Sequence, residues 1–132
     1  CIMEVHRRTL PGETREDVYR EFRERLDRLA AGNKNFGYDI TEPSWLITPN
    51  DISLQEPVVL SLLKAYKAVT GEQRAVEAFV AGSDAPHMGF PTVVCGPGSI
   101  TQAHSTCEFV EVDQLARAAE MYLWTVLDLL GV

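Results

Sequence analysis

The stretch FPTVVCGPGS, residues 90–99, decides the fold that this sequence predicts. Residues 91–95 form an apolar run of the kind found in strands that are buried on both faces, as in parallel sheets covered by helices. The glycines and proline that follow indicate a tight loop just past the end of the strand, where open α/β sheets place their ligands. We therefore expect an α/β fold with a functional loop that begins at Gly96.

The segments on either side of this stretch predict further elements of the same layer. On the C-terminal side, apolar residues at helical spacing predict a helix over residues 112–130. Its expected inner face consists of Leu115, Ala119, Tyr122, Leu123, Val126 and Leu130. On the N-terminal side, residues 76–81 predict a short strand. Before that strand, Ser53 and Glu56 form a capping box for a helix that ends at Gly71.

The first third of the chain predicts a strand, a helix and a second strand. Residues 1–8 read as a strand, and Thr14 with Asp17 resembles a capping box at the start of a helix over residues 13–31. Gly32 and Asn33 supply a stop signal, since both tolerate the left-handed conformation that closes helices. Residues 36–48 alternate in part, with a proline at position 43 that suits an edge strand or a bulge.

The best boundary in the sequence is Pro49-Asn50-Asp51. It separates residues 1–48, with the order strand, helix, strand, from residues 49–132, with the order helix, strand, strand, helix. The two patterns predict two different layers of structure. The chain opens on Cys-Ile-Met-Glu-Val, which reads like the middle of a strand, so we expect further polypeptide upstream.

Charge and cysteine content exclude several classes of function. The net charge of −7 argues against nucleic acid and against anionic membranes as partners, because both require a concentrated basic surface. Three cysteines are an odd number without metal-finger spacing, which favours free thiols and a cytoplasmic setting. No apolar stretch is long enough to span a bilayer, and no secretory signal is recognisable at the start.

Most of the chemical information lies in residues 96–110. Gly96 and Gly98 allow close approach of the backbone to a bound group, and loop amides next to Ser99 can form an anion-binding concavity. His104 can offer a neutral imidazole nitrogen to a transition metal, and Glu108 could support it as a nearby carboxylate. Taken alone, however, a Gly-Pro-Gly turn and a single loop histidine more often have no ligand.

The order of motifs resembles a known family. The segment GPGSI at 96–100, QAH at 102–104 and EFV at 108–110 closely resembles the C-terminal signature of amidohydrolases of the acetylornithine deacetylase and succinyl-diaminopimelate desuccinylase type. RRTLPGE at 7–13 resembles the lid motif of this family, SDA at 83–85 resembles a family turn, and FPTVV at 90–94 resembles the strand before the loop. The resemblance spans nearly the whole chain.

This resemblance implies a site with two zinc ions, or cobalt or manganese in their place, of which His104 is one ligand. Gly96, Gly98 and Ser99 would contact the carboxylate end of the substrate, and Glu108 would lie behind the ligand. The remaining ligands and the general-base glutamate would lie upstream, so we expect no catalytic residue in this chain and no activity from it alone. The substrate would be a small N-acyl amino acid or a peptide.

The family fold would make residues 1–48 the second half of a ferredoxin-like α+β lid, through which a homodimer forms. Residues 49–132 would be the C-terminal part of the catalytic sheet. The sequence departs from the family pattern at four positions, namely His6, Pro86, His87 and Cys107. The departure at positions 86 and 87 argues against the desuccinylase branch.

Three other interpretations remain open. The chain could belong to a dipeptidase or carboxypeptidase of the same family, or it could be a non-catalytic dimerisation or interaction module that keeps family sequence. The loop from Gly96 to Ser99 could instead bind a phosphate, as glycine-rich turns do. Against the phosphate interpretation, no lysine follows the loop, and a helix is predicted only about a dozen residues later.

Overall fold

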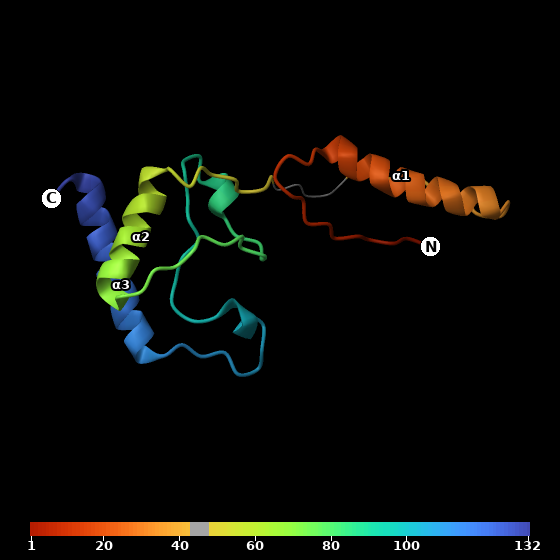
Figure 1. The fold of residues 1–132 in the computed structure, drawn as a ribbon. Helices are drawn as coiled ribbons and strands as arrows, with labels where there is room; N and C mark the ends of the chain where they lie inside the picture. The colour runs from red at the N-terminus through yellow and green to blue at the C-terminus, as the bar shows by residue number, and fades with distance from the viewer. Residues whose placement is uncertain (43–47) are drawn as a thin grey trace. The chain divides into compact units, whose positions relative to one another are not determined.

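The computed structural model describes residues 1–42 and 48–132 (Figure 1). Three α-helices lie in these ranges: α1 (Arg15–Gly32), α2 (Pro57–Thr70) and α3 (Val112–Leu130). Two short 3-10 helices, η1 (Ala85–His87) and η2 (Ile100–Gln102), lie between α2 and α3. None of the helices in the described part of the chain has the length and apolar content needed to cross a bilayer.

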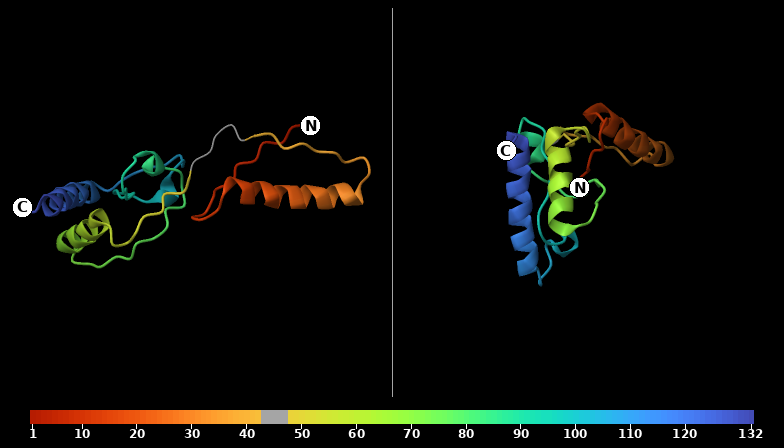
Figure 2. Two further views of the ribbon diagram at one scale, coloured as in Figure 1. Left: turned by 90° about the horizontal axis from the view of Figure 1, so that it is seen from above. Right: turned by 60° about the vertical axis from the view of Figure 1, so that its left-hand side comes forward.

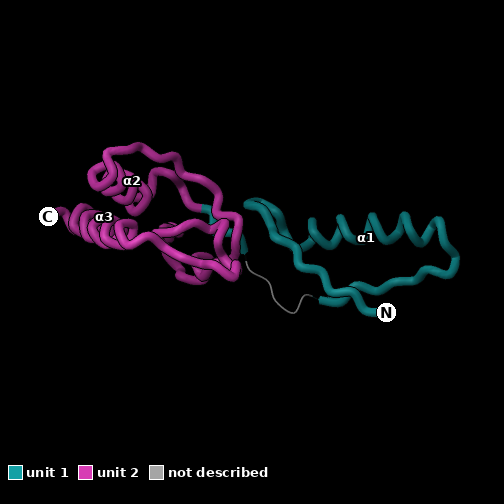
Figure 3. The backbone as a smooth tube through the Cα atoms, turned by 90° about the horizontal axis from the view of Figure 1, so that it is seen from below, with its two compact units in different colours: residues 1–51 teal, residues 52–132 magenta. Residues whose placement is uncertain are grey.

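The chain divides into two compact units, Cys1–Asp51 and Ile52–Val132 (Figure 3). Unit 1 contains α1, and unit 2 contains the other helices. The assignment of residues 1–48 to a lid and of residues 49–132 to a catalytic layer stays a prediction, because this division records which residues pack together and not what they do.

Helix α1 begins with a reciprocal cap. The Thr14 hydroxyl accepts a hydrogen bond from the Asp17 N–H, and the Thr14 N–H donates to the Asp17 carboxylate, so the predicted capping box is confirmed. The helix ends at Gly32, but the next residue, Asn33, is extended with a φ of −144°. The prediction of a left-handed stop at this end was therefore wrong.

Polar contacts hold the segment that follows α1 against the helix. The Tyr19 hydroxyl donates to the Thr41 carbonyl oxygen at 3.2 Å, and the Tyr38 hydroxyl donates to Asp27 Oδ1 at 2.6 Å. Figure 2 shows this segment running back along α1. The Arg15 guanidinium also pairs with Glu42 at 2.9 Å, and no residue of α1 is buried.

In unit 2 the helices α2 and α3 pack side by side (Figure 2). The buried residues of the two helices are small or flexible: Val59, Ser61 and Ala65 in α2, and Ala118, Met121 and Thr125 in α3. Small residues let two helices approach closely, which increases the number of dispersion contacts per unit of length. Together with Ala85 of η1, the buried apolar residues of the two helices form the small core of unit 2.

A polar bridge fixes the register of this helix pair. The Ser61 hydroxyl donates to Asp128 Oδ2 at 2.7 Å, and the Lys64 ammonium donates to the other oxygen of the same carboxylate. The hydrogen bonds and charge of Lys64, together with the Ser61 hydroxyl, lower the pKa of Asp128 below its usual value of 3.8. The charged form of the Asp128 carboxylate therefore stabilises the pairing of α2 with α3.

The ends of α2 and α3 test the local predictions. Helix α3 spans Val112–Leu130 as predicted, and Gly71 closes α2 in the left-handed conformation with a φ of 76°. The capping box of Ser53 and Glu56 was wrong: Glu56 is the N-cap without a side-chain cap, and Pro57 fills the first helical position. Proline suits this position because its missing N–H would have no helical partner there.

The predicted inner face of α3 was also wrong. The residues that face α2 are Ala118, Met121 and Thr125, whereas the predicted inner residues Leu115, Tyr122, Leu123, Val126 and Leu130 are 42–72% exposed. The buried residues and the predicted ones both recur at helical spacing. The apolar side of α3 is therefore wider than one neighbouring helix can cover. The pattern predicted the larger apolar half, while the smaller side chains are the ones in contact.

The predicted α/β fold is contradicted, because residues 1–42 and 48–132 contain helices and no strand. The segments expected to be strands, 1–8, 76–81, 91–95 and the described part of 36–48, form no strand. Residues 43–47, including the predicted bulge, lie outside the described residues. The run 91–95, expected to be buried on both faces, is half-buried or exposed. A strand is stabilised by hydrogen bonds to a neighbour, so an apolar pattern without that neighbour gives only extended chain.

Replacement of Asp128 by Asn tests the bridge between α2 and α3. Because the folded-state pKa of Asp128 is lowered, its stabilisation is present above pH 3.8 and is lost as the pH falls through the lower folded value. We expect D128N to lower the melting temperature by a few degrees at neutral pH, measured by circular dichroism, and the difference should shrink well below pH 3.8.

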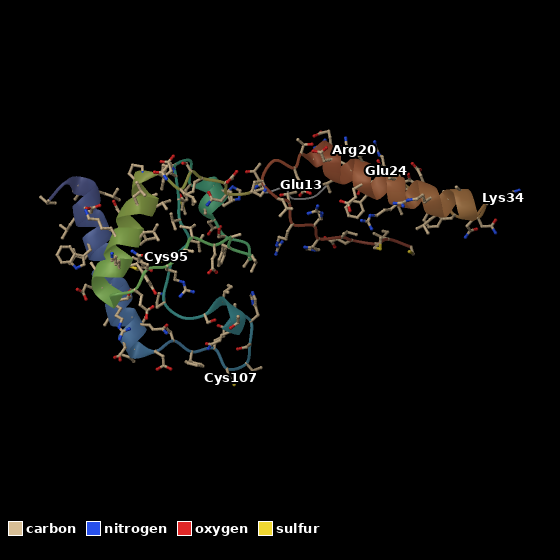
Figure 4. The ribbon with its side chains drawn as sticks, viewed as in Figure 1. Glu13, Arg20, Glu24, Lys34, Cys95 and Cys107 are labelled. Carbon is tan, nitrogen blue, oxygen red and sulfur yellow. The ribbon has the colours of Figure 1, made fainter. Side chains whose placement is uncertain are left out.

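Glu24→Gln is the matched control, since it removes one negative charge from an exposed position on α1 (Figure 4). We expect no change in the melting temperature of unit 2 for E24Q. Equal effects of the two variants at every pH would show that Asp128 acts only through net charge.

Replacement of Thr14 by Ala tests the capping box of α1. Hydrogen bonds from the Thr14 side chain and backbone, followed by the one from Arg20, lower the pKa of Asp17 from 3.8 to about 2. We expect T14A to raise the pKa of Asp17 toward 3.8, and Arg20→Ala to raise it less, in a carboxyl-carbon NMR titration. A pKa that stays at about 2 in T14A would contradict the cap.

Candidate functional site

The loop of residues 96–110 connects Cys95 to the segment before α3 and belongs to unit 2. Figure 4 labels the cysteines near its two ends: Cys95 lies beside the helices, and Cys107 lies at the outer side of the loop. Cys1, Cys95 and Cys107 are all free thiols. The start of the loop therefore lies against the helices, and the part around Cys107 lies away from them.

A hydrogen bond from α3 holds the second glycine of the loop. The Gly98 N–H donates to Gln114 Oε1 at 2.8 Å, and Gly98 has a φ of +90°, which L-residues with side chains rarely adopt. A Cβ at this position would lie 3.8 Å from the Val110 side chain, an ordinary contact. Glycine is therefore needed here for its backbone conformation and not for lack of space.

A second hydrogen bond from α3 holds the start of the loop. The Tyr122 hydroxyl donates to the Cys95 carbonyl oxygen at 3.0 Å. Burial raises the pKa of Tyr122 above its usual value of 10.0, so the hydroxyl keeps its proton across the physiological range. Gly96 lies just beyond this contact, and a Cβ there would be 3.7 Å from the Tyr122 hydroxyl oxygen.

The hydroxyl of Ser99 is used inside the loop. Ser99 caps η2, its Oγ accepts from the Thr101 N–H at 3.4 Å, and it lies 2.8 Å from the Thr101 hydroxyl oxygen. A ligand that bound Ser99 would have to compete with this short turn. The structure thus places Gly96, Gly98 and Ser99 in one continuous, exposed segment next to α3.

His104 has an unusual backbone conformation. It is the one non-glycine residue with a positive φ, 62°, in residues 1–42 and 48–132. Its N–H donates to the Glu108 carboxylate, which closes a turn of five residues, 104–108. Histidine tolerates this left-handed conformation better than most residues, and the carboxylate stabilises it. The imidazole is exposed and has no hydrogen bond or ion pair to any described residue.

Glu108 contacts the main chain of His104 and not its ring. The carboxylate therefore orients the histidine through the backbone. Its proposed place behind a metal ligand stays a prediction.

The described residues alone do not complete a metal site. Among residues 1–42 and 48–132, no three side chains of the His, Cys, Asp or Glu type are gathered where they could hold an ion. Zinc sites need about three protein ligands. His104 fits the chemistry of one such ligand, since its ring is exposed and not engaged by the described residues, but it cannot hold an ion by itself.

The other two histidines have local contacts. His87 ends η1, and its N–H donates to the Asp84 carbonyl oxygen at 2.9 Å in the turn whose Ala85 is buried. His6 Nε2 lies 3.8 Å from Glu4 Oε1 at the exposed start of unit 1. Neither lies in the loop of residues 96–110.

Sequence reasoning missed the residues that hold the loop. Gln114 and Tyr122 on α3 bind its first part, and Gln102 Oε1 accepts from the Phe109 N–H at 3.4 Å across its second part. Tyr122 was assigned only to an apolar face. Two features of the sequence could have indicated these contacts. Tyr122 carries a hydroxyl on an otherwise apolar face, and Gln114 lies in the first turn of a helix that follows a glycine-rich loop.

Comparison with known proteins identifies the family. Residues 10–128 match the family described as Peptidase family M20/M25/M40. No curated protein and no solved structure matches the chain. The loop of residues 96–110 lies inside the matched range. The protein is therefore of the class that hydrolyses peptide and related amide bonds with the help of metal ions. The chain belongs to the peptidase family M20/M25/M40.

Replacement of Glu108 by Ala tests the turn at His104. Loss of the carboxylate leaves the His104 N–H without its acceptor, and we expect its exchange with solvent to rise roughly fivefold, the usual net worth of one hydrogen bond. Glu108→Gln keeps a carbonyl acceptor and should restore most of the protection in amide exchange by NMR. An unchanged rate in E108A would exclude this contact.

Proposed function

We propose that this chain is part of a metal-dependent amidohydrolase that cleaves the amide bond of an N-acyl amino acid, in the manner of acetylornithine deacetylase-like enzymes. The observation that carries the proposal is His104, which lies in a family-type motif inside the matched residues 10–128 and presents an exposed imidazole. The Glu108 carboxylate fixes the backbone of that residue in a left-handed turn. A ligand histidine needs such a fixed direction.

His104 would be one ligand of a site with two zinc ions, with cobalt or manganese as substitutes. Metal ions of this kind polarise the amide carbonyl and lower the pKa of bound water. The other ligands and the general base would come from polypeptide beyond the described residues. This chain's own part would be to hold one imidazole at the site.

The segment Gly96, Gly98 and Ser99 would receive the carboxylate end of the substrate. Three features support this role: the segment is exposed, it is fixed to α3 by hydrogen bonds, and its glycines leave the backbone accessible. The segment lies five residues before His104, so one loop would hold both the substrate and a metal ligand.

The two units would have different tasks in the complete enzyme. Residues 1–48 would belong to the lid, through which two copies associate, and residues 49–132 to the catalytic domain. The exposed apolar residues of both units, such as Leu29 on α1 and Leu123 on α3, support further packing of this kind. Free thiols agree with a cytoplasmic setting.

The same exposed apolar surface also favours the second candidate function, a dimerisation or interaction module without chemistry. The wide apolar side of α3 would serve either candidate, because burial of that surface is favourable whatever covers it. Metal binding separates the two candidates, since only the hydrolase needs His104 as a ligand.

The test uses the complete, metal-loaded enzyme with His104→Ala. We expect metal content to fall and kcat/KM for N-acetyl amino acids to drop by at least ~100-fold, because one ligand of the site is lost. Metal analysis and a hydrolysis assay with N-acetyl amino acids and dipeptides in parallel give both results. The ratio of the two activities separates a deacetylase from a dipeptidase.

His87→Ala is the matched control, because it removes the same side chain from η1, outside the loop. We expect full metal content and activity from H87A. If H104A kept both properties, the hydrolase role of that residue would be wrong. If the unaltered enzyme bound no metal, the interaction module would be the better description.

A further inference from the structure

The two hydrogen bonds from α3 fix the directions of two peptide units in the Gly-Pro-Gly turn. A peptide unit is planar, and in a trans unit the C=O and the following N–H point in opposite directions. The chain has no cis peptide bond in its described residues. Tyr122 binds the carbonyl of the Cys95–Gly96 unit, so the Gly96 N–H points away from the Tyr122 hydroxyl.

The next available amide points the other way. Pro97 has no N–H, so the following donor in the turn is Gly98. The Gly98 N–H is directed at Gln114 Oε1 and is already used by it. Within the described residues, the Gly96 N–H has no hydrogen-bond partner, and Gly96 is exposed.

We infer that Gln114 and Tyr122 are positioning residues that make the Gly96 N–H, and not the Gly98 N–H, the donor that this turn offers to a carboxylate. The inference rests on the proposed function, which assigns the turn to the carboxylate end of the substrate. It divides the roles of the two glycines: Gly96 is the donor, and Gly98 provides the positive φ that lets its N–H reach Gln114.

The experiment uses the full chain labelled with ¹⁵N-glycine, whose nine glycines give a small set of signals. Amide exchange with solvent reports which N–H groups are bonded, and titration with sodium acetate reports which ones meet a carboxylate. Sodium chloride at equal ionic strength is the salt control. We expect Gly98 to exchange slowly and Gly96 quickly, and acetate to shift Gly96 but not Gly98.

Three variants test the two positioning residues one at a time. Gln114→Ala should raise Gly98 exchange roughly fivefold and make Gly98 respond to acetate, because its donor is released. Gln114→Glu keeps an acceptor and should restore Gly98 protection. Tyr122→Phe removes only the hydroxyl and should move the Gly96 ¹⁵N signal, since that nitrogen shares a peptide unit with the Cys95 carbonyl.

Gln102→Ala is the matched control, because its side chain binds the Phe109 N–H in the same loop and does not contact Gly98. It should leave both glycine signals unchanged. The inference is overturned if Gly98 exchange is the same in Q114A and in the unaltered chain, or if acetate shifts Gly98 while Gln114 is present.

Failure of the proposed function gives a different pattern. If Gly98 loses protection in Q114A and Q114E restores it, the positioning role of Gln114 is supported even when no glycine responds to acetate. If acetate then shifts neither glycine in any variant, the assignment of this turn to the substrate carboxylate is what fails.

Discussion

The contact between α2 and α3 is the constraint on which unit 2 depends. Ser61 and Lys64 on one helix meet the Asp128 carboxylate on the other, and both helices also contribute small buried residues such as Ala65 and Ala118. Because Asp128 lies in the last turn of α3, this bridge fixes how far the helix slides along α2. The position of α3 in turn sets where Gln114 and Tyr122 stand, and these two residues hold the Gly-Pro-Gly turn.

The sequence predicted those features that depend on near neighbours. The Thr14 cap and the bounds of α3 were found because helix hydrogen bonds join residues four apart, and caps lie within the same turn. The strand at residues 91–95 was predicted from an equally clear pattern, yet a strand needs a partner that its own residues do not specify. Likewise, the apolar spacing on α3 could not tell which of two apolar faces meets α2.

The candidate site was predictable to a similar extent. The family match covers the motif around His104. The residues of this motif and its position after an apolar run could both be read from the sequence. The contacts of the motif were not visible, because a side-chain amide that binds a backbone N–H sixteen residues away leaves no periodic trace. Glu108 illustrates the difference: its nearness to His104 was foreseen, but its contact is with the backbone N–H and not with the ring.

The thinness of the core has a thermodynamic consequence. Only five apolar residues are buried among the described ones, and α1 buries none. Unfolding therefore exposes little additional apolar surface to solvent. The heat-capacity increment of unfolding and the denaturant m-value both scale with newly exposed surface. A chain of this kind should therefore have a flat stability curve and a broad, shallow denaturation profile, until another polypeptide covers its apolar faces.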